Sequence, residues 1–424
     1  MTERSASAEL SIAAAAREAG DRPAIITRDR TLTFRECADR AAAINPVPSS
    51  LVAVPSISTV LAVHAALEAR RPLALVHAKL APHERARQLA AIDGHALADD
   101  TAFVLFTSGS TGAARGVVLS RSAIVAAAAA STARLGWRDD DRWLSCLPMA
   151  HAGGLSIVVR CLAARRPIVL HDGDFDPGAV LELARARQAT LASFVPAQVS
   201  AFVELCAAPP PTLRAAVLGG AAAAPTLVED AVARRWPILP SYGLTETFGQ
   251  IATARVPGGP PIVLPGVELV VDETLHVRGP MLATGYLGGP AIAPELVTAD
   301  LGSVDADGAV HVLGRKDDVI ITGGEKIHPL EVEAVLTATP GVRAACAFAV
   351  ADPRWGHVVA AAIATDAAFV PEDARARWHA ALPSHARPRR LAVLPELPLL
   401  PSGKLDRRAI AALPTAPMVY GSEH

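Results

Sequence analysis

Short apolar runs alternate with alanine-rich stretches through the first half of the chain. The runs are rich in Val, Ile and Leu and end near Gly, Pro or Asp, which is typical of buried strands. The alanine-rich stretches between them favour helices. Strands that alternate with helices predict a parallel α/β architecture. The predicted strands cover residues 24–27, 51–54, 73–76, 103–106, 167–170, 215–218 and 236–239.

The pattern changes after Gly258, where Pro- and Gly-rich segments separate short alternating strands. This change predicts a small antiparallel β subdomain that ends near Leu313. A charged break follows, and we expect a separate α+β domain after it. The predicted domains are residues 1–316 and residues 317–424. The expected elements of these later regions are strands at 268–271, 275–278, 344–350 and 357–363, helices at 329–336 and 372–382, and a terminal tail.

Composition narrows the class of protein. Hydrophobic residues make up 51% and charged residues 19%, which favours a folded core over disorder. A formal charge of −2 gives no basic surplus for nucleic acid or an anionic membrane. No apolar run approaches the ~18 residues of a membrane span, and the N-terminus lacks a signal-peptide pattern. Five cysteines without a Cys-x-x-Cys pair suggest reduced, packed thiols. We therefore expect a cytoplasmic protein, and a homodimer remains open.

The first chemical signal is a loop that follows the apolar run 103–106. Its glycines allow backbone N–H groups to turn inward, its hydroxyls add donors and its arginine adds a fixed cation, so the loop predicts a cradle for a polyphosphate. It lacks the Gly-Lys-Ser/Thr ending of a Walker A loop. An ordinary Gly/Ser hairpin is the alternative. The cradle residues are Thr107, Ser108, Gly109, Ser110, Thr111, Gly112 and Arg115.

A second signal lies at Tyr242, Thr245 and Glu246, again after an apolar run. An aromatic ring can stack on a base, a hydroxyl can bind a phosphate oxygen, and a carboxylate can hold Mg²⁺. In isolation, a tyrosine such as Tyr242 is more often a core aromatic residue. Two further segments accompany it, one with Asp300 and the later residues 314–318, and one with Lys404 near the C-terminus.

These four segments, in this order, resemble the adenylate-forming superfamily of acyl-CoA synthetases, peptide-synthetase adenylation domains and luciferases. The resemblance covers nearly the whole chain. It implies a large N-terminal domain and a small mobile C-terminal lid that changes position between two half-reactions. In the first, a carboxylic acid and MgATP form an acyl-adenylate and pyrophosphate, and in the second a thiol displaces AMP.

The resemblance also implies a role for each matching residue. The loop with Arg115 would hold the triphosphate, Thr245 would contact the α-phosphate, and Glu246 would bind magnesium. Lys404 would bridge the carboxylate and the α-phosphate, so that with Thr245 and Glu246 it forms the predicted catalytic set. The other implied sites are the adenine wall (Gly219, Gly220, Ala221), the stacking ring (Tyr242), the ribose contacts (Asp300, Arg315) and the hinge (Asp317).

Two positions depart from the family pattern. Ala114 and Arg115 stand where many relatives have Pro-Lys, and an arginine is bulkier and forked. We expect ATP use to be retained with altered kinetics of the pyrophosphate loop. The ribose motif reads Thr-Ala-Asp instead of the frequent Thr-Gly-Asp, but Asp300 itself is present.

Three segments are similar to the o-succinylbenzoyl-CoA synthetase branch of the superfamily, which serves menaquinone biosynthesis. They are residues 147–157, 241–253 and 323–329, and Gln250 in the second is the most telling. This similarity implies o-succinylbenzoate as the acid and coenzyme A as the thiol. Gly323 and Gly324 would line the CoA passage when the lid rotates. A carrier protein as acceptor stays open.

Candidate acid-binding residues follow from this similarity. Arg160 lies in an apolar helical stretch, where a cation could pair with the second carboxylate of a dicarboxylic substrate. A surface arginine is the alternative, because Arg165 and Arg166 follow closely. His151 next to Gly153 is expected in the acid pocket with Gln250, and a core histidine is its alternative.

Two other functions remain open at this stage. One is a ligase for a different aryl or medium-chain carboxylic acid. The other is a noncatalytic nucleotide-binding module, which the presence of both Glu246 and Lys404 argues against.

Overall fold

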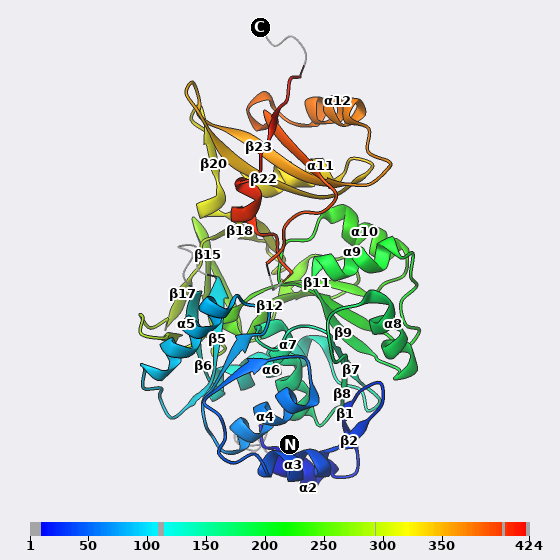
Figure 1. The fold of residues 1–424 in the computed structure, drawn as a ribbon, viewed down its shortest axis with the longest axis vertical. Helices are drawn as coiled ribbons and strands as arrows, with labels where there is room; N and C mark the ends of the chain where they lie inside the picture. Colours follow the sequence, from blue (N-terminus) through cyan, green and yellow to red (C-terminus); the bar gives the residue numbers. More distant parts are fainter. Residues whose placement is uncertain (1–9, 109–113, 293, 401–402, 421–424) are drawn as a thin grey trace.

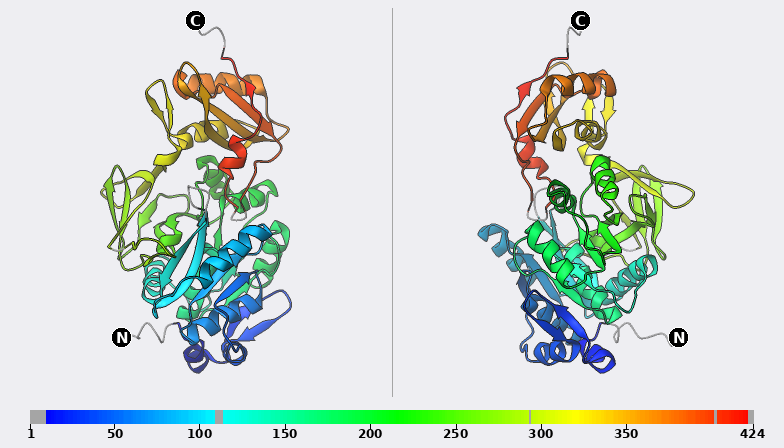
Figure 2. Two further views of the ribbon diagram at one scale, coloured as in Figure 1. Left: turned by 60° about the vertical axis from the view of Figure 1, so that its left-hand side comes forward. Right: turned by 90° about the vertical axis from the view of Figure 1, so that its right-hand side faces the viewer.

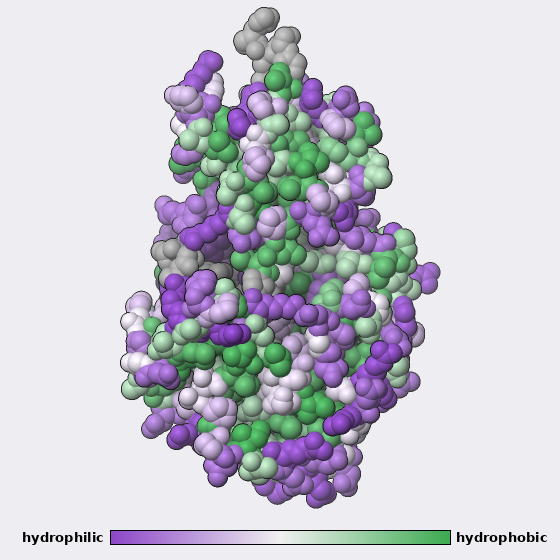
Figure 3. Space-filling model, viewed as in Figure 1, coloured by the Kyte–Doolittle hydropathy of each residue, from purple (hydrophilic) through white to green (hydrophobic). Residues whose placement is uncertain are grey.

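The computed structural model describes residues 10–108, 114–292, 294–400 and 403–420. Two bodies lie one above the other, a large one that contains most of the chain and a small one formed by the C-terminal part (Figures 1 and 2). The fold is mixed α/β, as the sequence predicts. The surface is hollowed between the two bodies on the face shown in Figure 3.

A nine-stranded sheet forms the centre of the large body. Its middle strands are parallel and almost wholly buried, because they are continuous apolar runs covered on both faces. In spatial order the strands are β13 (Pro261–Val263), β12 (Gly249–Ala254), β11 (Ile238–Leu244), β10 (Ala215–Leu218), β9 (Leu191–Phe194), β7 (Trp143–Ser145), β8 (Ile168–Leu170), β1 (Pro23–Ile26) and β2 (Thr31–Thr33).

A five-stranded sheet carries the predicted phosphate loop. Its order is β16 (Gly285–Tyr286), β6 (Ala114–Ser120), β5 (Thr101–Ser108), β4 (Leu73–His77) and β3 (Ser50–Ala53). Strands β5 and β6 are antiparallel, as are β1 and β2, so each of these two sheets is mixed. The short connections at residues 27–30 and 109–113 are too short for a parallel crossover.

Nine helices of the described part surround these sheets. Hydroxyl or carboxylate side chains cap several of them, such as Thr33 in a capping box with Glu36, and proline starts others. Their bounds are α2 (Ile12–Ala19), α3 (Phe34–Ala42), α4 (Ile57–Glu68), α5 (Pro82–Asp93), α6 (Arg121–Leu135), α7 (Ala152–Ala164), α8 (Pro177–Ala186), α9 (Pro196–Glu204) and α10 (Pro225–Ala233).

The predicted antiparallel β subdomain is present. It contains β14 (Glu268–Asp272), β15 (Thr274–Arg278) and β17 (Glu295–Val297), followed by the hairpin of β18 (Asp300–Val304) and β19 (Val310–Arg315). The last strand extends two residues beyond the expected end. Short 3₁₀ turns at Thr245–Thr247 (η1) and Lys316–Asp318 (η2) lie next to candidate site residues.

The small body has its own hydrophobic clusters, whose members all lie between Ile320 and Tyr420. This agrees with a boundary near residue 316, which stays a prediction. The expected tail instead contains a strand, a helix and a second strand. The elements are β20 (Ile320–Thr322), β21 (Glu325–Ile327), α11 (Pro329–Thr337), β22 (Val342–Asp352), β23 (Gly356–Thr365), α12 (Pro371–Ala381), a 3₁₀ turn (Ser384–Ala386), β24 (Arg390–Leu394), α13 (Arg407–Ala411) and β25 (Ala416–Pro417).

The cysteines are unpaired, as expected, but not all are packed. Four are buried, whereas Cys206 is exposed just beyond the end of α9. No helix within residues 10–108, 114–292, 294–400 and 403–420 is long and apolar enough to cross a membrane.

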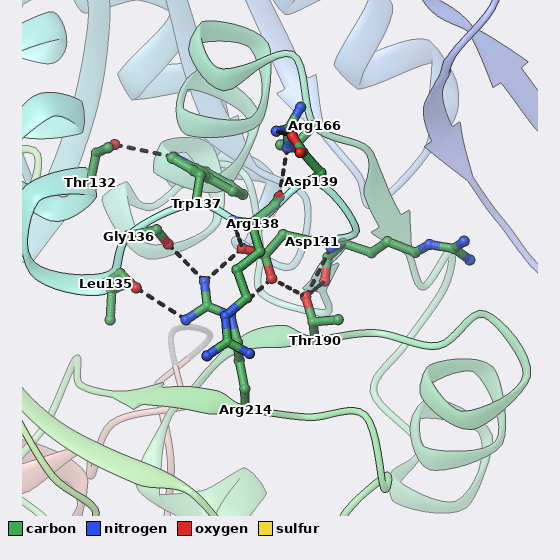
Figure 4. A network of polar contacts seen from close by, with 11 residues as sticks. Thr132, Leu135, Gly136, Trp137, Arg138, Asp139, Asp141, Arg166, Thr190 and Arg214 are labelled. Carbon is green, nitrogen blue, oxygen red and sulfur yellow. Dashed lines mark hydrogen bonds and ion pairs between the residues drawn. The ribbon is translucent and has the colours of Figure 1, made fainter.

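A buried ion pair ties the end of α6 to the central sheet (Figure 4). Arg214 contacts Asp141 at 2.6 Å and also donates to the carbonyls of Leu135 and Gly136. Burial alone would raise the pKa of Asp141, but hydrogen bonds from Arg214, the Arg138 N–H and Thr190 hold it below its usual value. The network thereby fixes α6, which lies beside the candidate acid site.

We expect Arg214→Met to lower the free energy of unfolding by about 3 kcal/mol, because it leaves the Asp141 carboxylate buried without its cation. Arg28→Met is the control, because the pair of Arg28 with Glu182 is exposed and such pairs contribute about 1 kcal/mol or less. Urea titrations measure both. Since the pKa of Asp141 is depressed, the contribution of its ionised form is present at neutral pH and is lost as pH falls through the folded-state pKa. Equal effects of the two substitutions would contradict this role.

Candidate active site

Lys404 lies in a tight turn between β24 and α13 that reaches down to the large body (Figures 1 and 2). Backbone hydrogen bonds join Leu400 N–H to the Lys404 carbonyl at 2.7 Å and Gly403 N–H to the Leu400 carbonyl at 2.8 Å. Gly403 has a φ of +81°, which glycine adopts without strain. A Cβ at Gly403 would lie 3.3 Å from Val195, at the start of α9, so the turn touches the large body.

The Lys404 ammonium group lies among charges from the large body. Loss of hydration lowers its pKa, whereas the carboxylates of Asp300 and Glu246 act to raise it and Arg315 acts to lower it. The side chain is nevertheless exposed to solvent. The pKa reflects the protein around the side chain, and the exposure reflects its open side. The side chain therefore lies in a recess that is open to solvent. Three of the four predicted segments therefore meet at one place.

Tyr242 and Arg315 contact the two carboxylate oxygens of Asp300, the residue predicted to bind ribose. The Tyr242 hydroxyl donates to Asp300 Oδ2 at 2.7 Å, and an Arg315 N–H lies 3.4 Å from Oδ1. Burial first, and then the Asp300 charge, raise the pKa of the Tyr242 phenol. The Tyr242 ring also packs against the hydrophobic core. Both interpretations of this residue therefore hold, because its ring belongs to the core and its hydroxyl contacts Asp300.

Glu246 sits in η1 directly after Thr245 and is 8% exposed. Its Oε1 accepts a hydrogen bond of 2.9 Å from Tyr286, a residue that the sequence analysis missed. Burial and the neighbouring carboxylate raise the pKa of Tyr286 to about 12. The chain has three tyrosines, and their scarcity was the one signal that could have drawn attention to Tyr286.

The predicted adenine wall follows β10 directly. Gly219 N–H donates to the Phe194 carbonyl, and Gly220 has a φ of +84°. A Cβ at Gly220 would lie 3.1 Å from Val195, the residue that also meets the Lys404 turn. Gly219, Gly220 and the exposed Ala221 therefore lie close to that turn.

The structure describes only part of the predicted phosphate loop. Thr107 lies at the end of β5 and Arg115 near the start of β6, and the Thr107 hydroxyl donates to the Arg115 carbonyl. Ser108 ends β5, whereas Gly109, Ser110, Thr111 and Gly112 lie outside the described residues.

Arg160 is buried, so the surface interpretation is wrong. Its residue is 4% exposed, its guanidinium lies 5.4 Å above the Trp143 ring, and burial lowers its pKa to about 10. One of its amino groups would lie 3.7 Å from a Cβ at Gly249, three residues after Glu246. In the described part of the chain it has no hydrogen-bond or carboxylate partner. Arg165, which suggested a surface, is itself buried and pairs with Glu18.

His151 and Gly153 lie at the N-terminal end of α7, on the Lys404 side of the fold. Burial first, then the charges of His77 and Lys404, lower the pKa of His151 to about 4. Its ring centroid lies 5.1 Å from that of His77, and its Nε2 atom is buried without a partner. Gly153 is exposed at the first turn of the helix.

Gln250 is buried near this helix, but protein groups already hold its amide. Ser131 donates to Oε1 at 3.0 Å, and Nε2 donates to Thr253 at 2.8 Å. The structure thus places Gln250 on β12, where its side chain contacts α6 through Ser131.

The predicted hinge and CoA passage lie on the small body and its connection. Asp317, in η2, is exposed and lies 3.5 Å from Arg315. Gly323 and Gly324 form the β20–β21 turn with positive φ values of +55° and +93°. Gly323 N–H donates to the Trp355 carbonyl within the small body, so the hairpin is held there in this arrangement.

Comparisons with known proteins identify the family. The profile of the AMP-binding enzymes matches residues 91–287, and the profile of their C-terminal domain matches residues 331–404. A 2-succinylbenzoate–CoA ligase from Bacillus licheniformis is 34% identical over 338 residues, which are 74% of this chain and 70% of that protein. The chain belongs to the AMP-binding enzyme family. Its resemblance to the adenylate-forming superfamily is thereby confirmed.

Two solved structures match nearly the whole chain. This AMP-binding enzyme matches Bacillus subtilis o-succinylbenzoate CoA synthetase in complex with the acyl-adenylate intermediate at a TM-score of 0.85, and a double mutant bound to a product analogue at 0.67. Identity is 26% and coverage 96% of this chain and 99% of the other in both cases. The structure of this AMP-binding enzyme is thus more similar overall to the adenylate complex than to the complex with the product analogue.

We expect Lys404 to titrate below Lys316, because burial lowers the pKa of Lys404 whereas the hydrogen bond from Lys316 to Glu273 raises that of Lys316. Acetylation at a series of pH values, read by mass spectrometry, gives both pKa values in one sample. Glu246→Gln should lower the pKa of Lys404 further and leave Lys316 unchanged. A Lys404 that titrates like an ordinary surface lysine in both proteins would contradict the recess.

Proposed function

We propose that this AMP-binding enzyme converts o-succinylbenzoate to o-succinylbenzoyl-CoA through an acyl-adenylate, with ATP, Mg²⁺ and coenzyme A, in menaquinone biosynthesis. The observation that carries the proposal is the position of Lys404 among Asp300, Glu246 and Arg315. The curated relative and the solved structures described above carry the same acid in their names. The substrates ATP and CoA suit a cytoplasmic enzyme, and a homodimer is an assembly that light scattering would test.

In the adenylation step, a carboxylate oxygen attacks the α-phosphorus of ATP and pyrophosphate leaves. Both reactants are anions, so their approach requires positive charge at the reacting atoms. Lys404 would supply it between the carboxylate and the α-phosphate, with Thr245 as a further donor. Tyr242 would face the adenine opposite Gly219, Gly220 and Ala221, while Asp300 and Arg315 would hold the ribose hydroxyls.

The donor set fits a magnesium ion bound with the substrate. Glu246 Oε2 has no hydrogen bond in the described part of the chain, and no cluster of three His, Cys, Asp or Glu side chains suited to a metal exists there. A hard cation at Glu246 would therefore take its other ligands from phosphates and water. Such an ion supplies charge neutralisation to the triphosphate when bound.

In the second step, a thiolate attacks the acyl carbonyl and AMP leaves. Lys404 would have to withdraw first, which a rotation of residues 317–424 about Asp317 would achieve. The same rotation would bring Gly323 and Gly324 toward the path of the CoA arm. Gln250, held by Ser131 and Thr253, would support the acid pocket beside His151 and Gly153.

Arg160 supports a dicarboxylic acid over an acid with one carboxylate. A buried guanidinium without a carboxylate partner is costly unless a ligand provides one. The second carboxylate of o-succinylbenzoate is such a group, whereas a benzoate or a fatty acid has none to offer.

An acid panel tests the proposed function through ATP–pyrophosphate exchange. We expect exchange with o-succinylbenzoate and little with benzoate or medium-chain fatty acids. Lys404→Ala should abolish the exchange while thiolysis of supplied acyl-adenylate continues, because only the first step uses the lysine. Exchange with another acid alone would favour a different ligase, and ATP binding without exchange for any acid would favour a noncatalytic module.

Arg160→Met should raise the KM for o-succinylbenzoate by about 30-fold or more, because truncation removes a desolvated charge pair worth about 2–5 kcal/mol. The KM for an analogue that lacks the succinyl carboxylate should change little. Arg185→Met, on the exposed face of α8, is the control. If both acids respond equally to the loss of Arg160, the residue does not recognise the second carboxylate.

A further inference from the structure

Tyr286 links two parts of the site that belong to different sheets. Its hydroxyl donates to Glu246 Oε1, and the guanidinium of Arg115 lies 4.3 Å from the centroid of its ring. A cation at this distance over an aromatic face is attracted to it. Arg115, Tyr286 and Glu246 thus form one chain of contacts, from the base of the phosphate loop to the metal-binding carboxylate.

Backbone hydrogen bonds fix Tyr286 from both sides. Strand β16 pairs with β6, where Tyr286 lies opposite Val117 and Leu287 N–H donates to the Gly116 carbonyl at 2.7 Å. On the other side, Ala283 N–H donates to the Glu246 carbonyl at 2.7 Å. The phenol is therefore presented to Glu246 by a strand that is tied to the loop and to η1.

The contact also distinguishes the two oxygens of Glu246. An ionised carboxylate has several acceptor sites, and the phenol occupies one on Oε1. Oε2 has no hydrogen bond among the described residues and is the oxygen left for a cation. A carboxylate held in one orientation binds with less loss of side-chain entropy than a free one.

We propose that Tyr286 is a positioning residue of the adenylation step, which orients Glu246 toward the metal–triphosphate complex, and that Arg115 holds the Tyr286 ring for this purpose. The proposal rests on the proposed function. It gives a role to the arginine that replaces the usual lysine of the family, because a planar guanidinium stacks on a ring better than an ammonium group does. The base of the phosphate loop and the metal-binding carboxylate then move as one unit.

Calorimetry without the acid substrate tests the proposal. The variants are Tyr286→Phe, which keeps the ring and removes the hydroxyl, Arg115→Met, which keeps the length and removes the cation, and the double variant. The matched control is Tyr420→Phe, which removes the hydroxyl of a buried tyrosine on the small domain. Each protein is titrated with MgATP and, without metal, with AMP, and its thermal unfolding is recorded.

We expect Tyr286→Phe to weaken MgATP binding about tenfold, in line with loss of a hydrogen bond to a charged group. AMP binding and the unfolding temperature should stay close to wild type, and Tyr420→Phe should change neither affinity. Arg115→Met should weaken MgATP binding as well. In the double variant, the fold loss of MgATP affinity should be smaller than the product of the two single losses, because both residues act through one contact.

Three results would overturn the proposal. They are unchanged MgATP binding in Tyr286→Phe, an equal loss of AMP binding, and losses that multiply fully in the double variant, which would mean that Arg115 acts on the phosphates independently. Because no acid takes part in the titrations, a wrong acid assignment would show in the exchange panel and leave these affinities unaffected.

Discussion

One ammonium group from the small domain lies among carboxylates of the large domain, and the active site depends on this placement. Asp300 and Glu246 offset the loss of hydration that Lys404 suffers in the recess, and Arg315 opposes them. Two positive and two negative side chains thus stand together before any substrate arrives. In the proposed adenylation step, a triphosphate and a carboxylate would add only negative charge, and Lys404 of the small domain would supply a cation that reaches both.

The forces that hold the small domain in place are weak individually. Across the two domains, Arg343 lies 3.6 Å from Glu204. Within the large domain, Lys316 next to the connection lies 2.6 Å from Glu273. Both pairs are partly or largely exposed, and such pairs contribute about 0–1 kcal/mol. The Lys404 turn meets the large domain at Val195. Weak contacts would suit the mobile lid that the resemblance to the superfamily implies.

The sequence predicted the strands and site residues that are marked by short, continuous stretches of the chain. Continuous apolar runs identified the buried parallel strands, and glycine, tyrosine and charged motifs identified Tyr242, Asp300, Arg315 and Lys404 as one site. It could not predict pairings between distant segments. Strand β24 adds in parallel to β23 after a long connection, and β16 meets β6 about 170 residues away in sequence, so neither β24 nor the role of Tyr286 was expected. The antiparallel pairing of β5 with β6 corresponds to the hairpin that the sequence left open as an alternative.

Burial of charge is the other property that the sequence left open, and the proposed specificity for the acid rests on it. Arg121, Arg160 and Arg165 are all at most 6% exposed. Arg121 donates to carbonyls at the end of α4, and Arg165 pairs with Glu18, so the fold compensates both. Arg160 has only the Trp143 ring within the described residues. A desolvated contact between a cation and an aromatic face contributes about 2 kcal/mol. It offsets only part of the several kcal/mol of hydration free energy that a buried cation loses. A buried guanidinium without a carboxylate partner would be stabilised by an anionic ligand, and the second carboxylate of the proposed acid would provide one.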